Sequence, residues 1–167
     1  MAEKDTIFSS KIKSDGFFDF RGFYEFCYKW LTEETGLDIT EKKYTEKLKG
    51  DSKDIELEWG GDKKITDYFK FEVKVEMMIR NMVNVEIKQG DKKIATNKGT
   101  AEVKMKGVLV RDYQGKFEKS GFLKFLRAIY EKWIIKSRTE EFEEKVFGDC
   151  DEFLGQAKAW LDLEGKR

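Results

Sequence analysis

The residue types that carry out most enzyme chemistry are unevenly represented in this chain. It contains no histidine, which excludes Ser-His-Asp and Cys-His nucleophile pairs, imidazole bases and zinc sites that use histidine. The two cysteines, Cys27 and Cys150, lie far apart and form no CxxC motif. We therefore expect neither a metal site nor a disulfide, and both thiols are predicted to be small buried hydrophobic residues.

Catalysis without histidine would need an Asp, Glu, Lys or Tyr side chain with a shifted pKa. In the strands that alternate clearly, the carboxylates and amines fall on the outer face. The remaining candidates are four tyrosines, Tyr44, Tyr68, Tyr113 and Tyr130. Because a buried tyrosine usually forms hydrogen bonds for structural reasons, we expect no catalytic residue, no cofactor and no enzymatic activity.

The overall composition predicts a single domain, 1–167, without a dominant charge. Basic and acidic residues balance at 33 each, so no global field attracts nucleic acid. A group of lysines around one hairpin and strand is interrupted by Glu102, so nucleic acid is not the expected partner: Lys92, Lys93, Lys98, Lys104 and Lys106. No apolar window is long enough for a transmembrane segment and the N-terminus lacks a hydrophobic signal core, so the expected location is cytoplasmic.

Aromatic residues crowd the segment DGFFDFRGFYEFCYKWL near the N-terminus. Its apolar positions recur with helical spacing, which predicts an amphipathic helix that begins after Asp19. Phe18 and Phe23 are placed to form a hydrophobic staple at its start, and Gly36 to cap its end in a left-handed conformation. Phe26 falls outside the main apolar stripe, so it either widens the buried face or lines an open space.

The middle of the chain changes to the two-residue period of β-strands. Alternation is strongest over 68–79, which predicts a half-buried antiparallel strand with a charged outer face. Further strands are predicted, with hairpin turns at GGDK and QGDK, over 6–13, 41–48, 55–59, 83–87, 93–97 and 101–109. Charges of both signs on the outer faces are expected to pair across strands.

Helical spacing returns near residue 118. The apolar residues over 118–136 form an arc wide enough to be covered on two sides. The next segment is expected to supply one cover, after a helix break marked by a capping box of Ser137 and Glu140. Residues 116–138 carry seven basic and two acidic side chains, whereas 139–164 carry two basic and nine acidic ones. We therefore expect these two helical parts to pair with each other.

These elements predict an α+β fold. It is a curved antiparallel meander sheet of about six to seven strands, with an N-terminal helix and a C-terminal helical segment packed on one face. This element order resembles the helix-grip superfamily, the START-like and birch-allergen-like proteins. The resemblance implies an apolar cavity between a long C-terminal helix and the sheet. The chain is also similar to uncharacterised archaeal proteins of this size.

The first functional hypothesis is that a small hydrophobic molecule binds between the sheet and the helix at 118–136. Gly107 removes a side chain in mid-strand, and methionines can repack around variable shapes. Arg111 is either a polar group at the mouth of this cavity or a strand-end charge that reaches solvent. The predicted ligand-binding residues are Phe26, Phe71, Val73, Val75, Met77, Met105, Gly107, Arg111, Tyr130 and Trp133.

The alternative hypothesis is a protein-protein interaction or scaffold domain in which the same inner residues fill a solid core. If the acidic C-terminal segment packs elsewhere, the basic amphipathic stretch KFLRAIYEKWIIKSR becomes a surface for a partner helix or a membrane. The cavity and the solid core thus remain two interpretations of one pattern.

Overall fold

The computed structural model describes residues 3–115, 120–134 and 136–165. Within these residues the chain forms one antiparallel sheet with the strands β1 (Glu3–Phe18), β2 (Asp38–Lys49), β3 (Ser52–Lys64), β4 (Phe69–Gln89) and β5 (Lys92–Arg111). The spatial order is β1-β5-β4-β3-β2, so β2 to β5 form a meander and β1 lies beside β5 at the far edge. This arrangement confirms the predicted α+β class and the antiparallel sheet.

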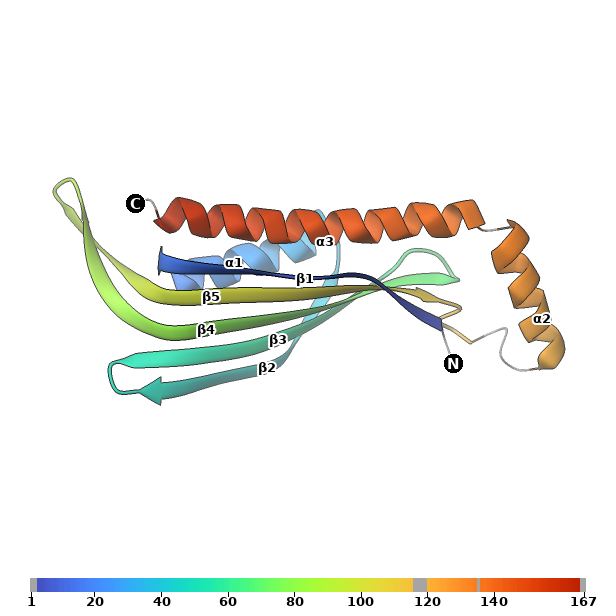
Figure 1. Ribbon diagram of the computed structural model, residues 1–167, viewed down its shortest axis with the longest axis horizontal. Coiled ribbons are helices and arrows are strands. Elements are labelled where there is room, and N and C mark those ends of the chain that lie inside the picture. The colour runs from blue at the N-terminus through green and yellow to red at the C-terminus, as the bar shows by residue number, and fades with distance from the viewer. Residues whose placement is uncertain (1–2, 116–119, 135, 166–167) are drawn as a thin grey trace.

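The helices divide into two that cover the sheet and one that stands apart. They are α1 (Phe20–Lys29) with the π-helical turn η1 (Trp30–Glu34), α2 (Gly121–Ile129) with the π-helical turn η2 (Tyr130–Ile134), and α3 (Lys136–Gly165). Figure 1 shows that α3 runs along the sheet. In the same view α2 lies beyond the ends of the strands, at a steep angle to α3. No helix in the described ranges is both long and apolar enough to cross a membrane.

In the described part of the chain the sheet has five strands rather than six to seven, because two predicted breaks lie inside β4 and β5. The register of β4 shifts between Arg80 and Val83, where Asn81 has a φ of 55° and its N–H donates to the Asp54 carboxylate at 2.9 Å. Gly99 passes so close that a Cβ there would lie 2.9 Å from the Arg80 carbonyl oxygen. A β-bulge at Asn81 and the close approach of Gly99 therefore lie within paired strands, where the sequence predicted that the strands end.

One predicted hairpin turn is confirmed and the other is wrong. The QGDK turn joins β4 to β5, with Gly90 at a φ of 60°. The GGDK segment instead lies inside β3, because the chain reverses only after residue 64. Gly61 is required for packing: a Cβ there would lie 2.5 Å from the Ile39 side chain and 2.9 Å from that of Val73.

The start and end of α1 follow the sequence prediction in most respects. The staple is confirmed, since the rings of Phe18 and Phe23 meet edge to face with centroids 6.4 Å apart. Gly36 has a φ of 72°, as the predicted left-handed cap requires. Asp19 occupies the N-cap position, but its side chain makes no capping hydrogen bond.

The core lies between the sheet and the two covering helices. The alternating residues of β4 from Phe69 to Ile79 are buried as predicted, and they join one apolar cluster with residues of α1 and α3. Both cysteines are free, and both are buried in this cluster, as predicted for small hydrophobic residues. Burial raises the pKa of the Cys27 thiol, and burial with the Asp149 charge raises the pKa of Cys150 to about 12. Neither thiol is therefore ionised at neutral pH.

The helix predicted over 118–136 was expected to cover the sheet, and this prediction is wrong. Its residues 118, 119 and 135 lie outside the described residues, and Lys136 already belongs to α3. Residues 121–134 form α2 and η2, in which no described side chain is fully buried. The sheet is covered instead by α3, through Val146, Cys150, Phe153, Leu154, Ala157 and Leu161. The capping box is also wrong, because Ser137 and Glu140 lie inside α3, while the Ser120 hydroxyl caps α2 by accepting from the Leu123 N–H at 3.1 Å.

Candidate functional site

Six of the predicted ligand-binding residues lie together beneath the covering helices. Five of them, Phe71, Val73, Val75, Met77 and Met105, are at most 5% exposed and belong to the apolar core. At the sixth, Gly107, a Cβ would lie 2.6 Å from the Cys150 sulfur and 3.2 Å from Val146 Cγ1.

Gly107 therefore makes room for α3, which fills the space above this strand. Because the Cys150 sulfur occupies that space, a ligand beside Gly107 would have to displace α3. Binding of a small hydrophobic molecule between the sheet and the C-terminal helix stays a prediction.

Of the three other predicted apolar residues, Phe26 and Tyr130 are partly buried and pack against this core, whereas Trp133 lies away from it. Phe26 on α1 stacks on Trp160 of α3, with ring centroids 6.1 Å apart. Tyr130 packs against Tyr68 at the end of the sheet, at 5.6 Å. Trp133 was expected to face the inner strands, but it is 74% exposed because η2 leaves the sheet.

Arg111, the polar residue among the predicted ligand-binding residues, lies at the centre of a cluster of charged side chains at the end of the sheet. Its guanidinium forms ion pairs with Glu3 at 2.9 Å, Asp5 at 2.9 Å and Glu131 at 3.0 Å. Arg127 on α2 binds Glu3 at 3.1 Å and the buried Asp112 at 3.5 Å. We call these residues the arginine clamp, because they fasten α2 and η2 to β1 and β5.

Tyr68 completes the arginine clamp by donating its hydroxyl hydrogen to Glu131. Burial, together with this carboxylate, raises the pKa of Tyr68. The Arg111 side chain is 20% exposed and its Nε has no hydrogen-bond partner within the described residues. Arg111 thus neither opens a cavity nor simply reaches solvent, and its contacts are those of a structural anchor.

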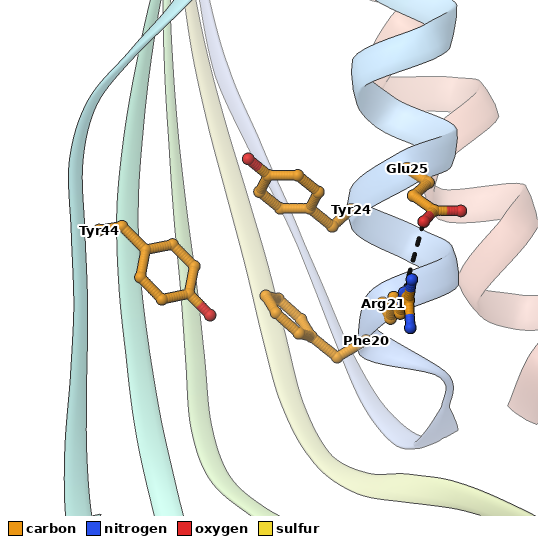
Figure 2. Close-up of a pocket in the computed structure, with 5 residues that line it drawn as sticks. All are labelled: Phe20, Arg21, Tyr24, Glu25 and Tyr44. Carbon is orange, nitrogen blue, oxygen red and sulfur yellow. Dashed lines mark ion pairs between the residues drawn. The ribbon is translucent and has the colours of Figure 1, made fainter.

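A shallow hollow between α1 and β2 was not foreseen. It encloses about 400 Å³ and is lined by Phe20, Arg21, Tyr24, Glu25 and Tyr44. In Figure 2, Phe20 and Tyr24 project from α1 toward the sheet, and the Tyr44 ring projects from β2 toward α1. We call this the aromatic hollow.

Two carboxylates hold the phenol groups of the aromatic hollow. Tyr24 donates its hydroxyl hydrogen to Glu41 at 3.1 Å, and Tyr44 donates to Glu46 at 2.9 Å. The pKa of Tyr44 is raised to about 12, mainly because the phenol is partly buried and also because it donates to Glu46. Burial and the carboxylate of Glu41 also raise the pKa of Tyr24. Both phenols are therefore neutral hydrogen-bond donors throughout the physiological pH range.

We expect the titration of Tyr44 to be visible in the alkaline absorbance of the protein. A folded pKa raised to about 12 from 10.0 means that the neutral phenol stabilises the fold fully below pH 10.0, and that this contribution disappears as pH rises toward 12. In a phenolate absorbance titration, Tyr44→Phe should remove a late-titrating component. Removal of a component that titrates near pH 10.0 would contradict the hydrogen bond to Glu46.

The second unforeseen surface is an aromatic face on α2 and η2. Its apolar residues follow one side of the helix and are mostly solvent-exposed: Phe122 at 68%, Phe125 at 60%, Ile129 at 37% and Trp133 at 74%. A different side of the same helix carries Arg127, Tyr130 and Glu131, which contact the sheet end. The arginine clamp therefore holds the helix with its aromatic face outward.

The electrostatic surroundings of this face are basic. Lys124 and Lys132 are exposed on the same helix, and Lys132 lies 5.3 Å from the Trp133 ring centroid. Exposed Lys136 and Arg138 follow at the start of α3. No metal site accompanies these features: in 3–115, 120–134 and 136–165, no three Cys, Asp or Glu side chains are grouped so that they could hold an ion.

No family model matches the chain, and no curated protein or solved structure is significantly similar to it. What the chain itself defines is an α+β fold with an apolar core between the sheet and the helices that cover it. The aromatic hollow and the aromatic face of α2 and η2 both lie at the surface.

Proposed function

We propose that the protein is a non-enzymatic interaction domain that binds a protein partner through the aromatic face of α2 and η2. The observation that supports this is the exposure of Phe122, Phe125 and Trp133 on one side of a helix whose other side is ion-paired to the end of the sheet. Aromatic side chains are enriched among the residues that dominate binding energy at interfaces. Contiguous apolar surface of this kind is typical of an interaction site.

The partner for which the chain offers complementary chemistry is a second copy of itself. Exposed carboxylates follow the outer side of α3, among them Glu140, Glu144, Asp151 and Glu152. This acidic side is opposite in charge to the basic surroundings of the aromatic face.

Two glycines on α3 also favour contact with a second chain. Gly148 and Gly155 lie seven positions apart and are exposed, and a Cβ built on either would meet nothing within 4 Å in the described structure. Close packing inside the domain therefore does not require a glycine at either position. A smooth, acidic helix surface accommodates the bulky rings of Phe125 and Trp133 from a second copy.

The size of the surfaces indicates a reciprocal dimer. Residues 121–134 form only about 21 Å of helix, which is short for the roughly 800 Å² per partner of a stable interface. In a twofold dimer each α2 docks on the α3 of the other chain, so the contact is made twice. We expect a weak dimer that salt dissociates, because the surfaces carry opposite charge.

Sedimentation velocity over a range of concentrations tests this function. The chain should change from monomer to dimer as concentration rises, and the double variant Phe125→Ala, Trp133→Ala should stay monomeric at every concentration. Leu48→Ala is the matched control, since Leu48 is 77% exposed on β2 and should leave the dimer intact.

Two outcomes would overturn the proposal. The first is a wild-type chain that stays monomeric at all concentrations. The second is a monomer whose tryptophan emission shifts to the blue on vesicles of anionic phosphatidylserine but not of phosphatidylcholine. Trp133 is by far the most exposed tryptophan, so such a shift would assign the aromatic face to a membrane surface instead.

Membership of the helix-grip superfamily is a further proposal. It is supported by the long C-terminal helix that lies along a curved antiparallel sheet (Figure 1). A structure of a relative with a clear family signature would test it, because the order β1-β5-β4-β3-β2 should then be shared.

A further inference from the structure

The aromatic hollow has walls that are fixed by packing behind them. The rings of Phe20 and Tyr24 lie 6.2 Å apart and are inclined by 57°. Tyr24 rests edge to face against Trp59, which is fully buried, at 5.1 Å. Tyr44 closes the opposite side from β2. Three aromatic rings from two elements thus border one space of about 400 Å³.

The charges around this space are mainly negative. Glu41 lies at the Tyr24 hydroxyl and Glu46 at the Tyr44 hydroxyl. Glu46 also lies 3.5 Å from the Lys53 ammonium, and Glu25 pairs with Arg21 at 3.5 Å. Glu41 forms no ion pair within the part of the chain that the structure describes. The lining itself thus holds one carboxylate and one basic group, Glu25 and Arg21, and two further carboxylates lie at the hydroxyls of its tyrosines.

We propose that the aromatic hollow binds a small organic cation that carries a methylated ammonium group. The negative faces of aromatic rings attract a cation, and such rings combined with carboxylates are the typical surroundings of quaternary ammonium ligands. The volume is at the lower end of the range for small-molecule sites, so it accommodates a whole small molecule as well as its charged group. This site is separate from the interaction surface proposed for α2 and η2.

Other ligand classes fit the aromatic hollow less well. An anion would meet Glu25 in the lining, with Glu41 and Glu46 at the two tyrosine hydroxyls, and the basic residue of the lining is Arg21, whose side chain is 89% exposed and paired with Glu25. A neutral apolar molecule would contact the rings but would gain nothing from the carboxylates. The positive charge is therefore what should distinguish the ligand from a molecule of the same shape.

A comparison of choline with its uncharged carbon isostere, 3,3-dimethylbutan-1-ol, tests this directly. Amide shift changes of the nitrogen-15-labelled protein are followed while either compound is added at constant ionic strength. We expect choline to bind with shifts centred on α1 and β2, and the isostere to bind about fivefold to tenfold more weakly. The amide of Nα-acetyl-trimethyllysine, tested in parallel, separates recognition of a modified side chain from recognition of a free small molecule.

Variants of the lining residues make the test specific. Tyr44→Leu should weaken choline binding about fivefold to tenfold, whereas Tyr44→Phe, which keeps the ring, should stay within about twofold. Glu41→Gln should also weaken it, since it removes a carboxylate without changing shape. Equal binding of choline and the isostere would overturn the proposal. So would a result in which neither choline nor the lysine derivative binds. So would choline shifts that persist unchanged in Tyr44→Leu.

Discussion

Replacement of Phe153 with alanine is expected to lower the free energy of unfolding by about 3–5 kcal/mol, the usual range for a buried phenylalanine. Phe153 is fully buried on the side of α3 that faces the sheet, and its ring lies 5.7 Å from that of Trp30. The substitution would leave a cavity where α3 meets η1 and the sheet. Since α3 covers β1 and β5, the cavity would loosen the main apolar contact of the fold.

Urea denaturation followed by circular dichroism measures this loss. A shift of the midpoint at unchanged slope would report a change in stability alone. Leu163→Ala is the matched control, because Leu163 lies on the same helix but is 69% exposed, and it should change stability by no more than about 0.5 kcal/mol. Equal effects of the two substitutions would contradict the packing of α3 on the sheet.

The parts of the fold that the sequence predicts are those in which one residue pattern has one physical cause. Strict alternation over β4 reflects burial of one strand face, and every second residue from Phe69 to Ile79 is indeed buried. Gly36 follows an amphipathic segment and adopts the left-handed conformation that favours glycine. In both cases the pattern is local, so no knowledge of distant neighbours is needed.

The position of α2 could not be predicted in this way. Helical spacing from Phe122 to Trp133 shows that one side of a helix is apolar, but the same spacing serves a buried face and an exposed one. What decides the outcome is the arginine clamp, in which Arg111 and Arg127 bind residues more than 100 positions away at the other end of the chain. Such pairing has no local signature.

The aromatic hollow was missed because a bulge hides the orientation of Tyr44. The register of β2 shifts between Glu41 and Lys43, so Tyr44 pairs with Leu57 while Ile39 pairs with Gly61. Tyr44 and Ile39 are five positions apart and yet share a face, which contradicts the two-residue period of a regular strand. A search for alternation therefore places Tyr44 on the wrong side of the sheet.

The second large loss of stability is expected when the arginine clamp is broken. Arg111→Met should lower the free energy of unfolding by about 2–4 kcal/mol, because it leaves three carboxylates close together without their common cation. The magnitude is smaller than for a fully buried pair, since Glu3 and Asp5 are about 40% exposed and water screens them. Glu131 is only 16% exposed and should contribute most of the loss.

A double variant separates repulsion among these carboxylates from simple loss of packing. Adding Glu131→Gln to Arg111→Met removes the most buried of the uncompensated charges, so part of the lost stability should return. Lys74→Met is the matched control on the outer face of β4. Lys74 also contacts two carboxylates, Glu58 at 3.5 Å and Glu76 at 3.1 Å, but it is 52% exposed, so its replacement should lower the free energy of unfolding far less than Arg111→Met does.

Hydrogen exchange locates the structural consequence of the same substitution. Amides of α2 should exchange faster in Arg111→Met than in the wild-type chain, while those of β4 keep most of their protection, because the arginine clamp fastens α2 but not the central strands. The aromatic face depends on this orientation, so the monomer-to-dimer transition should weaken as well. Unchanged exchange in α2 together with unchanged stability would show that Arg111 is a solvated strand-end charge.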